Sequence, residues 1–195
     1  RHTRCSGVSG LGDVYKRQDH KLAGKIAAES MVLLKNEGIL PLKAQGQKIA
    51  FIGKFAEKPR FQGGGSSHIN SFKITSALDA VKEVAEVTYA QGYDVKEDKI
   101  DEALLAEAVQ TAKEADVAVI FAGLPDAFES EGYDRSHMRM PDCQNILISR
   151  IAQVQKNVVV VLHNGSPVEM PWADEVKGIL EAYLLSLIHI SEPTR

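Results

Sequence analysis

Two runs of the chain are apolar at almost every position, and they constrain the fold more than any other feature. Residues 117–124 read VAVIFAGL and residues 157–165 read NVVVVLHNG, so neither run alternates between apolar and polar side chains. A strand with one face in water shows that alternation, whereas a strand inside a parallel sheet is covered on both faces. A helical pattern over 141–155, with Pro141 in its first turn, connects the runs. Together they predict a strand–helix–strand unit of a parallel sheet.

The rest of the chain continues this alternation of strands and helices. Spacing and turn residues predict further strands over 48–53, 86–92 and 178–184, and helices over 19–38, 75–85 and 101–115. The first of these helices places Leu22, Ile26 and Leu33 on one face, with Gly38 as its C-cap. Ser76 and Asp79 have the spacing of a capping box. The predicted fold is α/β, an open doubly wound and mostly parallel sheet with helices on both faces.

Both ends of the chain read as non-native. Residues 10–18 (GLGDVYKRQ) and 185–193 (LSLIHISEP) can be encoded by one DNA element in opposite orientations, and the tail resembles a transposase-type sequencing adapter read as coding sequence. Segments of this kind are excluded from fold reasoning. We therefore expect an adapter-like head over 1–18, one domain over 19–184 and an adapter-like tail over 185–195. The domain would then be truncated after its last predicted strand, and the truncated sheet would have an exposed strand edge, which predicts poor solubility or aggregation.

Composition excludes several classes of function for residues 19–184. This segment holds 18 basic and 24 acidic residues, whereas binding of a nucleic acid backbone needs a basic face. Cys143 is its one cysteine, so there is neither an internal disulfide nor the spacing of a zinc site. No apolar run reaches the roughly 20 residues that span a membrane. We expect no cofactor, no metal, no nucleic acid partner and no membrane partner.

Two loops of unusual composition follow predicted strands. Residues 63–67 read GGGSS and residues 129–135 read ESEGYDR. Right-handed crossovers place both loops at the edge where parallel strands end, which is where open α/β sheets bind ligands. The first loop lacks the Lys-Ser/Thr ending of a phosphate loop, so it is either a ligand contact or a flexible turn. A glutamate in the second loop would donate a proton near neutral pH only if its pKa were raised; otherwise the loop is simply solvated.

Four blocks of sequence resemble a known family. AAESMVLLKNEGILPL (27–42), GGGSS, ESEGYDR and NVVVVLHNGSPVEMPW (157–172) are similar, in this order, to the second domain of glycoside hydrolase family 3, the β-glucosidase group. The resemblance covers residues 19–184. It implies a retaining hydrolysis by two carboxylates, one of which attacks the anomeric carbon while the other acts first as an acid and then as a base. In the family, the attacking aspartate belongs to a preceding (β/α)₈ barrel.

The resemblance assigns roles within the acidic loop. The acid/base glutamate falls on Glu131, which directly precedes GYDR, and Glu129 is the reserve candidate. Asp134 and Arg135 match the motif and are expected to hold the loop in shape.

The remaining blocks receive other roles from the same resemblance. Ser66 matches the sugar-contacting serine of the Gly-rich loop, with Ser67 as the adjacent possibility. His163 is expected to be a satisfied scaffold histidine, and Glu169 to be structural.

The expected parent protein is therefore a β-glycosidase that acts on a β-linked glucoside or oligosaccharide. Its barrel is missing from this chain, so the chain alone is expected to be inactive. An alternative is a non-catalytic α/β module that binds a small ligand with the same two loops, and a nucleotide-binding protein is a third, disfavoured possibility.

Overall fold

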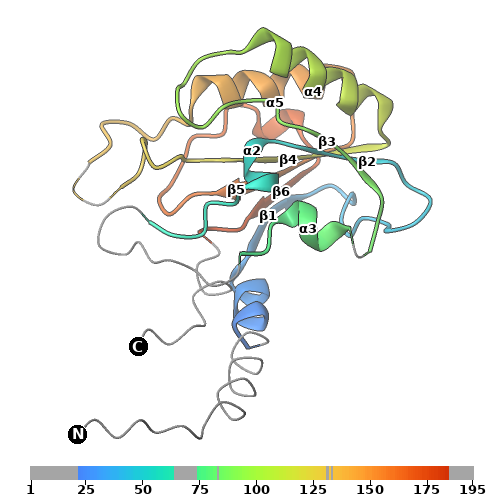
Figure 1. Cartoon of the computed structure of the whole chain (residues 1–195), viewed down its shortest axis with the longest axis horizontal. Coiled ribbons are helices and arrows are strands. Elements are labelled where there is room, and N and C mark those ends of the chain that lie inside the picture. The colour runs from blue at the N-terminus through green and yellow to red at the C-terminus, as the bar shows by residue number, and fades with distance from the viewer. Residues whose placement is uncertain (1–21, 64–73, 83, 131, 133, 185–195) are drawn as a thin grey trace, which may run out of the picture.

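The described residues form one sheet with helices on both of its faces (Figure 1). A computed structural model describes residues 22–63, 74–82, 84–130, 132 and 134–184. Its sheet has six strands in the order β1-β6-β5-β4-β2-β3. Their bounds are β1 Val32–Asn36, β2 Ile49–Ile52, β3 Val87–Ala90, β4 Val117–Gly123, β5 Val158–His163 and β6 Gly178–Glu181.

The two apolar runs form the middle of this sheet. Every residue of β4 is buried, and so is every residue of β5 except Val161. The two strands pair in parallel from Ala118 opposite Val158 to Gly123 opposite His163. β2 and β6 extend the parallel pairing on either side. The predicted α/β fold with a mostly parallel sheet is confirmed.

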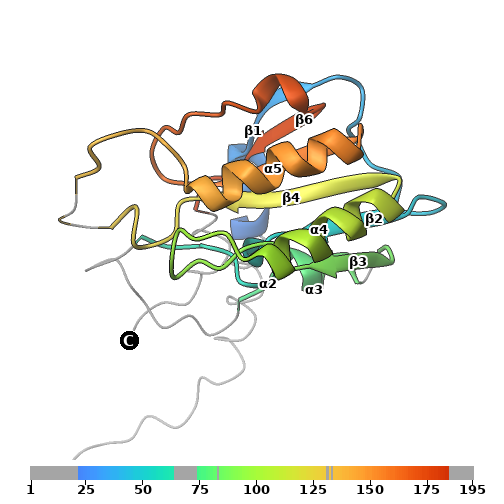
Figure 2. The ribbon, with the colours of Figure 1, turned by 90° about the horizontal axis from the view of Figure 1, so that it is seen from above.

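Helices cover the two faces as the alternation predicted. α4 (Glu102–Glu114) and α5 (Asp142–Val154) lie side by side on one face, and α3 (Ala77–Val81) and the helical residues 22–30 lie on the other (Figures 1 and 2). A short helix, α2 (Lys54–Glu57), follows β2 where the sequence suggested only a loop. A 3₁₀ turn, η2 (Ala173–Glu175), precedes β6.

Side-chain caps set the beginnings of the helices. The Ser76 side chain accepts a hydrogen bond from the Asp79 amide, so the predicted capping contact of α3 is present, although α3 ends earlier than predicted. The Asp101 carboxylate accepts from two amides at the start of α4. At α5, where Pro141 leaves no side-chain cap, the Asp98 carboxylate accepts from the amides of Asp142 and Cys143.

The helix predicted over 19–38 is wrong in its second half. The chain is helical over 22–30 and then forms β1, which pairs antiparallel with β6. The apolar residues of this segment carry a helical spacing, but pairing with the distant β6 overrides it. Leu33 is 51% exposed rather than packed on a helical face, and Gly38 adopts a φ of 76° in the turn after β1 instead of capping a helix.

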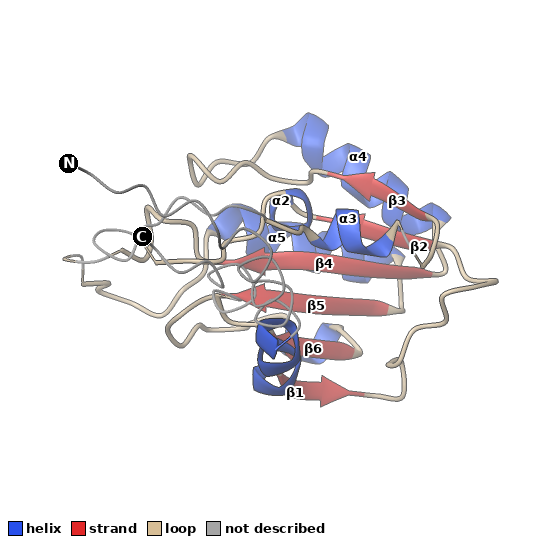
Figure 3. Cartoon of the chain, turned by 60° about the horizontal axis from the view of Figure 1, so that its bottom comes forward, coloured by secondary structure: helices blue, strands red, loops and turns tan. Residues whose placement is uncertain are grey.

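The last predicted strand, β6, does not lie at an edge of the sheet. β6 lies between β5 and β1, so its backbone is paired on both sides (Figure 3). The outer strands of the described sheet are β1 and β3.

Candidate functional site

The candidate site lies where β2, β4, β5 and β6 end, a place called here the carboxyl edge. The loops that follow β2, β4 and β5 meet there through side-chain hydrogen bonds rather than only through proximity. The link between the first two is Arg60, which comes from the loop after β2 and bonds Glu129 in the loop after β4. This contact supports the predicted convergence of the Gly-rich and acidic loops at one edge.

Arg60 is the most connected side chain at the carboxyl edge. Its side chain is only 5% exposed. Its Nη1 donates to the Leu124 carbonyl at 2.8 Å and to the Glu129 carboxylate, and its Nη2 donates to the Glu129 carbonyl at 2.6 Å. Its Nε donates to the Asp126 carboxylate at 3.1 Å. One guanidinium therefore bonds two backbone carbonyls and two carboxylates within residues 124–129.

Glu129 joins this arginine to the loop after β5. Its Oε2 also accepts from the Gly165 amide at 2.9 Å, and its Oε1 accepts from the Ser166 hydroxyl at 2.5 Å. The approach is close enough that a Cβ at residue 165 would lie 3.2 Å from Glu129 Oε1. A side chain at this position would therefore have to displace the carboxylate by a few tenths of an ångström.

These partners decide the ionisation of Glu129. Burial alone would raise its pKa, but the hydrogen bonds from Ser166, Gly165 and Arg60, together with the positive charge of Arg60, outweigh burial and lower the pKa below the ordinary value. The carboxyl is therefore ionised at neutral pH and its oxygens are already occupied. These properties do not suit a proton donor, so the reserve role for Glu129 is disfavoured.

The three residues predicted to act on a sugar, Glu131, Ser66 and Ser67, lie outside the described residues. Their neighbours Gly63, Gly132 and Asp134 are described, and Gly132 turns the chain with a φ of 77°. The loop-shaping role predicted for Arg135 agrees with its contact, because its Nη2 donates to the Pro167 carbonyl at 2.6 Å.

An open hollow of about 490 Å³ adjoins this loop and is lined by Glu129, Asp134, Arg135, Ser136, His137, Met138 and Ser166. Asp134 is exposed in it. The hollow is bounded by the loops after β4 and β5.

His163, at the end of β5, differs from its predicted description. It is buried as expected, but neither ring nitrogen has a hydrogen-bond partner among the described residues. Its ring packs near Phe55 and Phe121, with centroids 5.7 and 6.1 Å away. Burial lowers its pKa to about 4, which keeps the imidazole neutral at neutral pH.

Glu169 is exposed, and its backbone amide donates to the Met138 carbonyl, so the structural role expected of its side chain stays a prediction.

Sequence reasoning missed Arg60, Ser166 and a second buried carboxylate, Glu181. Glu181 ends β6 and accepts hydrogen bonds from the Asn164 side chain and the Tyr183 amide. Burial raises its pKa. The signal that pointed toward Arg60 was a single arginine just before the Gly-rich run, in a loop expected to face an acidic loop.

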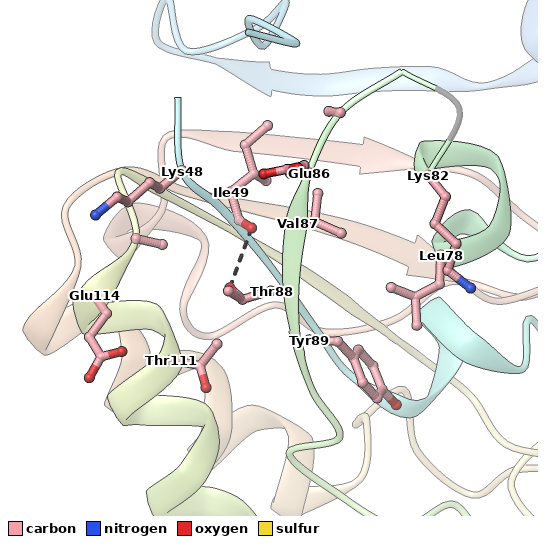
Figure 4. Close-up of a pocket in the computed structure, with 12 residues that line it drawn as sticks. Lys48, Ile49, Leu78, Lys82, Glu86, Val87, Thr88, Tyr89, Thr111 and Glu114 are labelled. Atoms are coloured by element: carbon pink, nitrogen blue, oxygen red, sulfur yellow. Dashed lines mark hydrogen bonds between the residues drawn. The ribbon is translucent and has the colours of Figure 1, made fainter. Parts of the chain in front are cut away.

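A larger hollow lies away from this edge, beside the outer strand β3, and is called here the β3 hollow. It measures about 1140 Å³ and runs between α3 and α4 along β3 (Figure 4). Lys48, Lys82, Glu86 and Glu114 line it, but the amino groups of the two lysines lie on opposite sides of the strand. Its polar groups do not converge on one point, so its size alone does not mark it as a site.

Two searches of the described residues gave no sites of other kinds. They contain no group of three or more His, Cys, Asp or Glu side chains placed to hold a metal ion. Within the same residues, no helix is long and apolar enough to cross a bilayer.

Comparison with known proteins decides the family. A sequence profile described as "Glycosyl hydrolase family 3 C-terminal domain" matches residues 31–186. The chain belongs to glycosyl hydrolase family 3. The match spans every strand of the sheet and both loops of the carboxyl edge.

Individual relatives in the family are glycosidases. The chain is 55% identical over 174 residues to thermostable β-glucosidase B of Acetivibrio thermocellus, a match that covers 87% of this chain and 23% of that protein. It is 49% identical over 176 residues to an exo-α-(1→6)-L-arabinopyranosidase of Bifidobacterium longum, covering 85% and 23%. A crystal structure of a β-glucosidase from Bifidobacterium adolescentis superposes with a TM-score of 0.79 at 51% identity, over 85% of this chain and 24% of that one. This chain thus spans about a quarter of the length of such relatives.

Proposed function

We propose that this domain belongs to a retaining β-glycosidase of the β-glucosidase type and supplies its acid/base glutamate, Glu131. A preceding (β/α)₈ barrel of the same parent chain supplies the aspartate nucleophile. The observation that carries the proposal is the convergence of the loops: the loop containing Glu131 is bonded, through Glu129 and Arg60, to the loop that leads into GGGSS. The family membership and the β-glucosidase relatives support the same assignment.

The proposed chemistry has two steps. In the first, the aspartate attacks the anomeric carbon while Glu131 gives its proton to the glycosidic oxygen, so the bond to the leaving group breaks as the glycosyl-enzyme ester forms. In the second, Glu131 takes a proton from water as the water oxygen attacks the same carbon and releases the aspartate. The two carboxyl groups of a retaining site lie about 5–5.5 Å apart, so a chain that carries only one of them is inactive alone.

The proposed substrate is a β-linked glucoside or oligosaccharide, held in part by Ser66, with Ser67 as the adjacent contact. The arabinopyranosidase relative is nearly as similar to this domain as the β-glucosidase is. Sugar choice is therefore assigned to the part of the parent protein outside this chain, and the domain contributes the proton transfer common to both chemistries.

The test uses the full-length parent protein, recovered from the source DNA, and its Glu131→Gln variant. We expect kcat/KM for cellobiose to fall by about 10²–10⁴-fold, because the poor leaving group needs a proton. An activated aryl glucoside such as the 2,4-dinitrophenyl compound needs little protonation and loses much less. The matched control is Glu169→Gln, which changes an exposed glutamate and leaves both rates unchanged. Unchanged cellobiose hydrolysis in Glu131→Gln would refute the proposal.

The same DNA tests the domain boundaries proposed for this chain. We propose that residues 1–18 and 185–195 derive from adapter sequence and that the native domain occupies 19–184. Sequencing across both junctions shows either a barrel-encoding frame upstream of Asp19 or a native continuation into residues 10–18. The second result would remove the adapter proposal.

A further inference from the structure

The contacts at the carboxyl edge point to a further set of functional residues. We propose that Arg60, Asp126, Glu129, Gly165 and Ser166, called here the Arg60 clamp, position the acid/base loop for proton transfer. This inference rests on the proposed function of Glu131. It concerns residues that do not touch the sugar themselves and that act through the loop they hold.

The Arg60 clamp holds the backbone at both ends of the segment from Leu124 to Glu129. Arg60 bonds the carbonyls of Leu124, directly after β4, and Glu129, five residues later. A planar guanidinium offers its donors in a fixed fork, so the two carbonyls cannot shift relative to each other without breaking a buried hydrogen bond. The start of the loop is thus tied to the rigid end of the central strand.

The clamp also joins three loops that are far apart in the sequence. Glu129 accepts hydrogen bonds from Arg60, in the loop after β2, and from Gly165 and Ser166, in the loop after β5. Its side chain is 20% exposed, and its carboxylate accepts from three described donors, one in the loop after β2 and two in the loop after β5. A side chain used only to fill space or to solubilise a loop needs no such set of directed partners.

The clamp reaches the proposed site through very short pieces of chain. Glu131 follows Glu129 by two residues, which span at most about 7 Å, so the anchored carbonyl limits where Glu131 can lie. Arg60 precedes Gly63, the first residue of GGGSS, by three positions. The same arginine therefore anchors the acid/base loop and is close in the sequence to the predicted sugar-contacting loop.

A positioning role predicts a particular pattern of kinetic loss. Displacement of a catalytic group by about 1 Å can reduce a rate by about 10²-fold. If the clamp aims Glu131, its loss must slow the reactions that depend on proton donation and spare those that do not. A role in stability alone would lower the amount of folded enzyme and so reduce all rates equally.

The experiment measures kcat/KM of the full-length parent for cellobiose and for 2,4-dinitrophenyl glucoside in four variants: Arg60→Met, Arg60→Lys, Ser166→Ala and Glu131→Gln. We expect Arg60→Met to lose about 10–100-fold with cellobiose and less than about threefold with the activated glucoside. Arg60→Lys recovers part of the loss, because it restores the charge without the fork. Ser166→Ala removes one hydrogen bond and shows a smaller loss of the same kind, and it provides the comparison even if Arg60→Met does not fold.

Lys82→Met, which breaks an exposed ion pair with Asp79 on the other side of the molecule, is the matched control and leaves both rates unchanged. Equal losses with the two substrates, or no loss in Arg60→Met and Ser166→Ala, would overturn the positioning role while Glu131→Gln still shows its selective effect. If Glu131→Gln itself leaves cellobiose hydrolysis intact, the proposed function fails instead. The two failures are therefore distinct.

Discussion

The carboxyl edge and the β3 hollow present opposite kinds of surface. The hollow beside β3 has more than twice the volume of the one at the carboxyl edge, about 1140 against 490 Å³. At the carboxyl edge, however, charged and polar groups from three loops bond one another, whereas the charges around β3 point in different directions. The comparison teaches that convergent, bonded polar groups identify a site better than empty volume does.

The position of β3 explains its hollow. Among the described strands, β3 pairs with β2 alone and is an outer strand of the sheet, so the hollow lies beside an unpaired edge. Charged residues such as Lys48, Lys82 and Glu86 border that space. Charges at an outer strand discourage pairing with another chain, so these side chains are explained by protection of the edge.

The largest difference between the two regions is expected in the free energy of unfolding that each loses when a glycine is replaced by alanine. Gly123 has a φ of 149°, and a Cβ there would lie 2.1 Å from the His163 carbonyl oxygen. Gly123→Ala must therefore push β4 and β5 apart and is expected to lower the free energy of unfolding by about 3–5 kcal/mol.

Gly46, in the turn before β2 and close to the β3 side, also has a positive φ but nothing within 4 Å of its would-be Cβ. Gly46→Ala costs only about 1 kcal/mol. Urea unfolding of the chain measures both variants, and equal losses would contradict the close packing inferred for the carboxyl edge.

The second difference is a dependence of stability on pH that arises at the carboxyl edge. Burial lowers the pKa of His163 from 6.5 to about 4, so between these values the unfolded chain binds a proton that the folded chain does not. Stability therefore rises with pH through this window, and the folded protein loses about 3 kcal/mol when the pH falls from 7 to 4. His163→Phe is expected to remove this part of the slope, as measured by urea unfolding at several pH values. His137→Phe, which changes an exposed histidine, keeps the slope; a slope unchanged in His163→Phe would show that His163 is not its source.

The smallest expected difference is in the free energy of unfolding that is lost when the Arg60–Glu129 pair is broken and when an exposed ion pair near β3 is broken. Glu129→Gln weakens the bonds to Arg60 and is expected to cost about 2 kcal/mol at pH 7, below the range for fully buried pairs because Glu129 is partly exposed. The pKa of Glu129 is lowered from 4.5, so this contribution is complete above pH 4.5 and is lost as the pH falls through the folded-state pKa.

Lys82→Met breaks the pair with Asp79, whose partners are both largely exposed, and is expected to change the unfolding midpoint little. Chemical denaturation at pH 7 and at pH 3 measures both variants. A cost of Glu129→Gln that stays the same at both pH values would contradict the assigned ionisation.

The middle of the fold could be predicted from the sequence because its signals are local. β4, β5, α4 and α5 each carry their own period or run of apolar residues, and they lie within two residues of the predicted bounds. β1 could not be predicted in this way, since its apolar residues have helical spacing and only the pairing with β6 makes them a strand.

The candidate site could be predicted only in part. The acidic loop stands out by composition, and the strand order places it at the carboxyl edge. The sequence around Arg60 does not specify that its guanidinium will bond Glu129, because that contact depends on the relative positions of the ends of β2 and β4 in the sheet. The surroundings of His163 show the same limit: the apolar run around it predicts burial, but it does not predict which groups lie against its ring nitrogens.

The antiparallel pair of β1 and β6 has a consequence for synthesis on the ribosome. β1 is the first described strand to be made and β6 the last, with about 140 residues between them. At roughly 5–20 residues per second, β1 waits about 7–30 s for its partner. During that interval Val32, Leu33 and Leu34, which stay at least two-fifths exposed even in the finished fold, have no strand beside them. The apolar side chains of β1 therefore lack their partner strand in the nascent chain until the last described strand has been made.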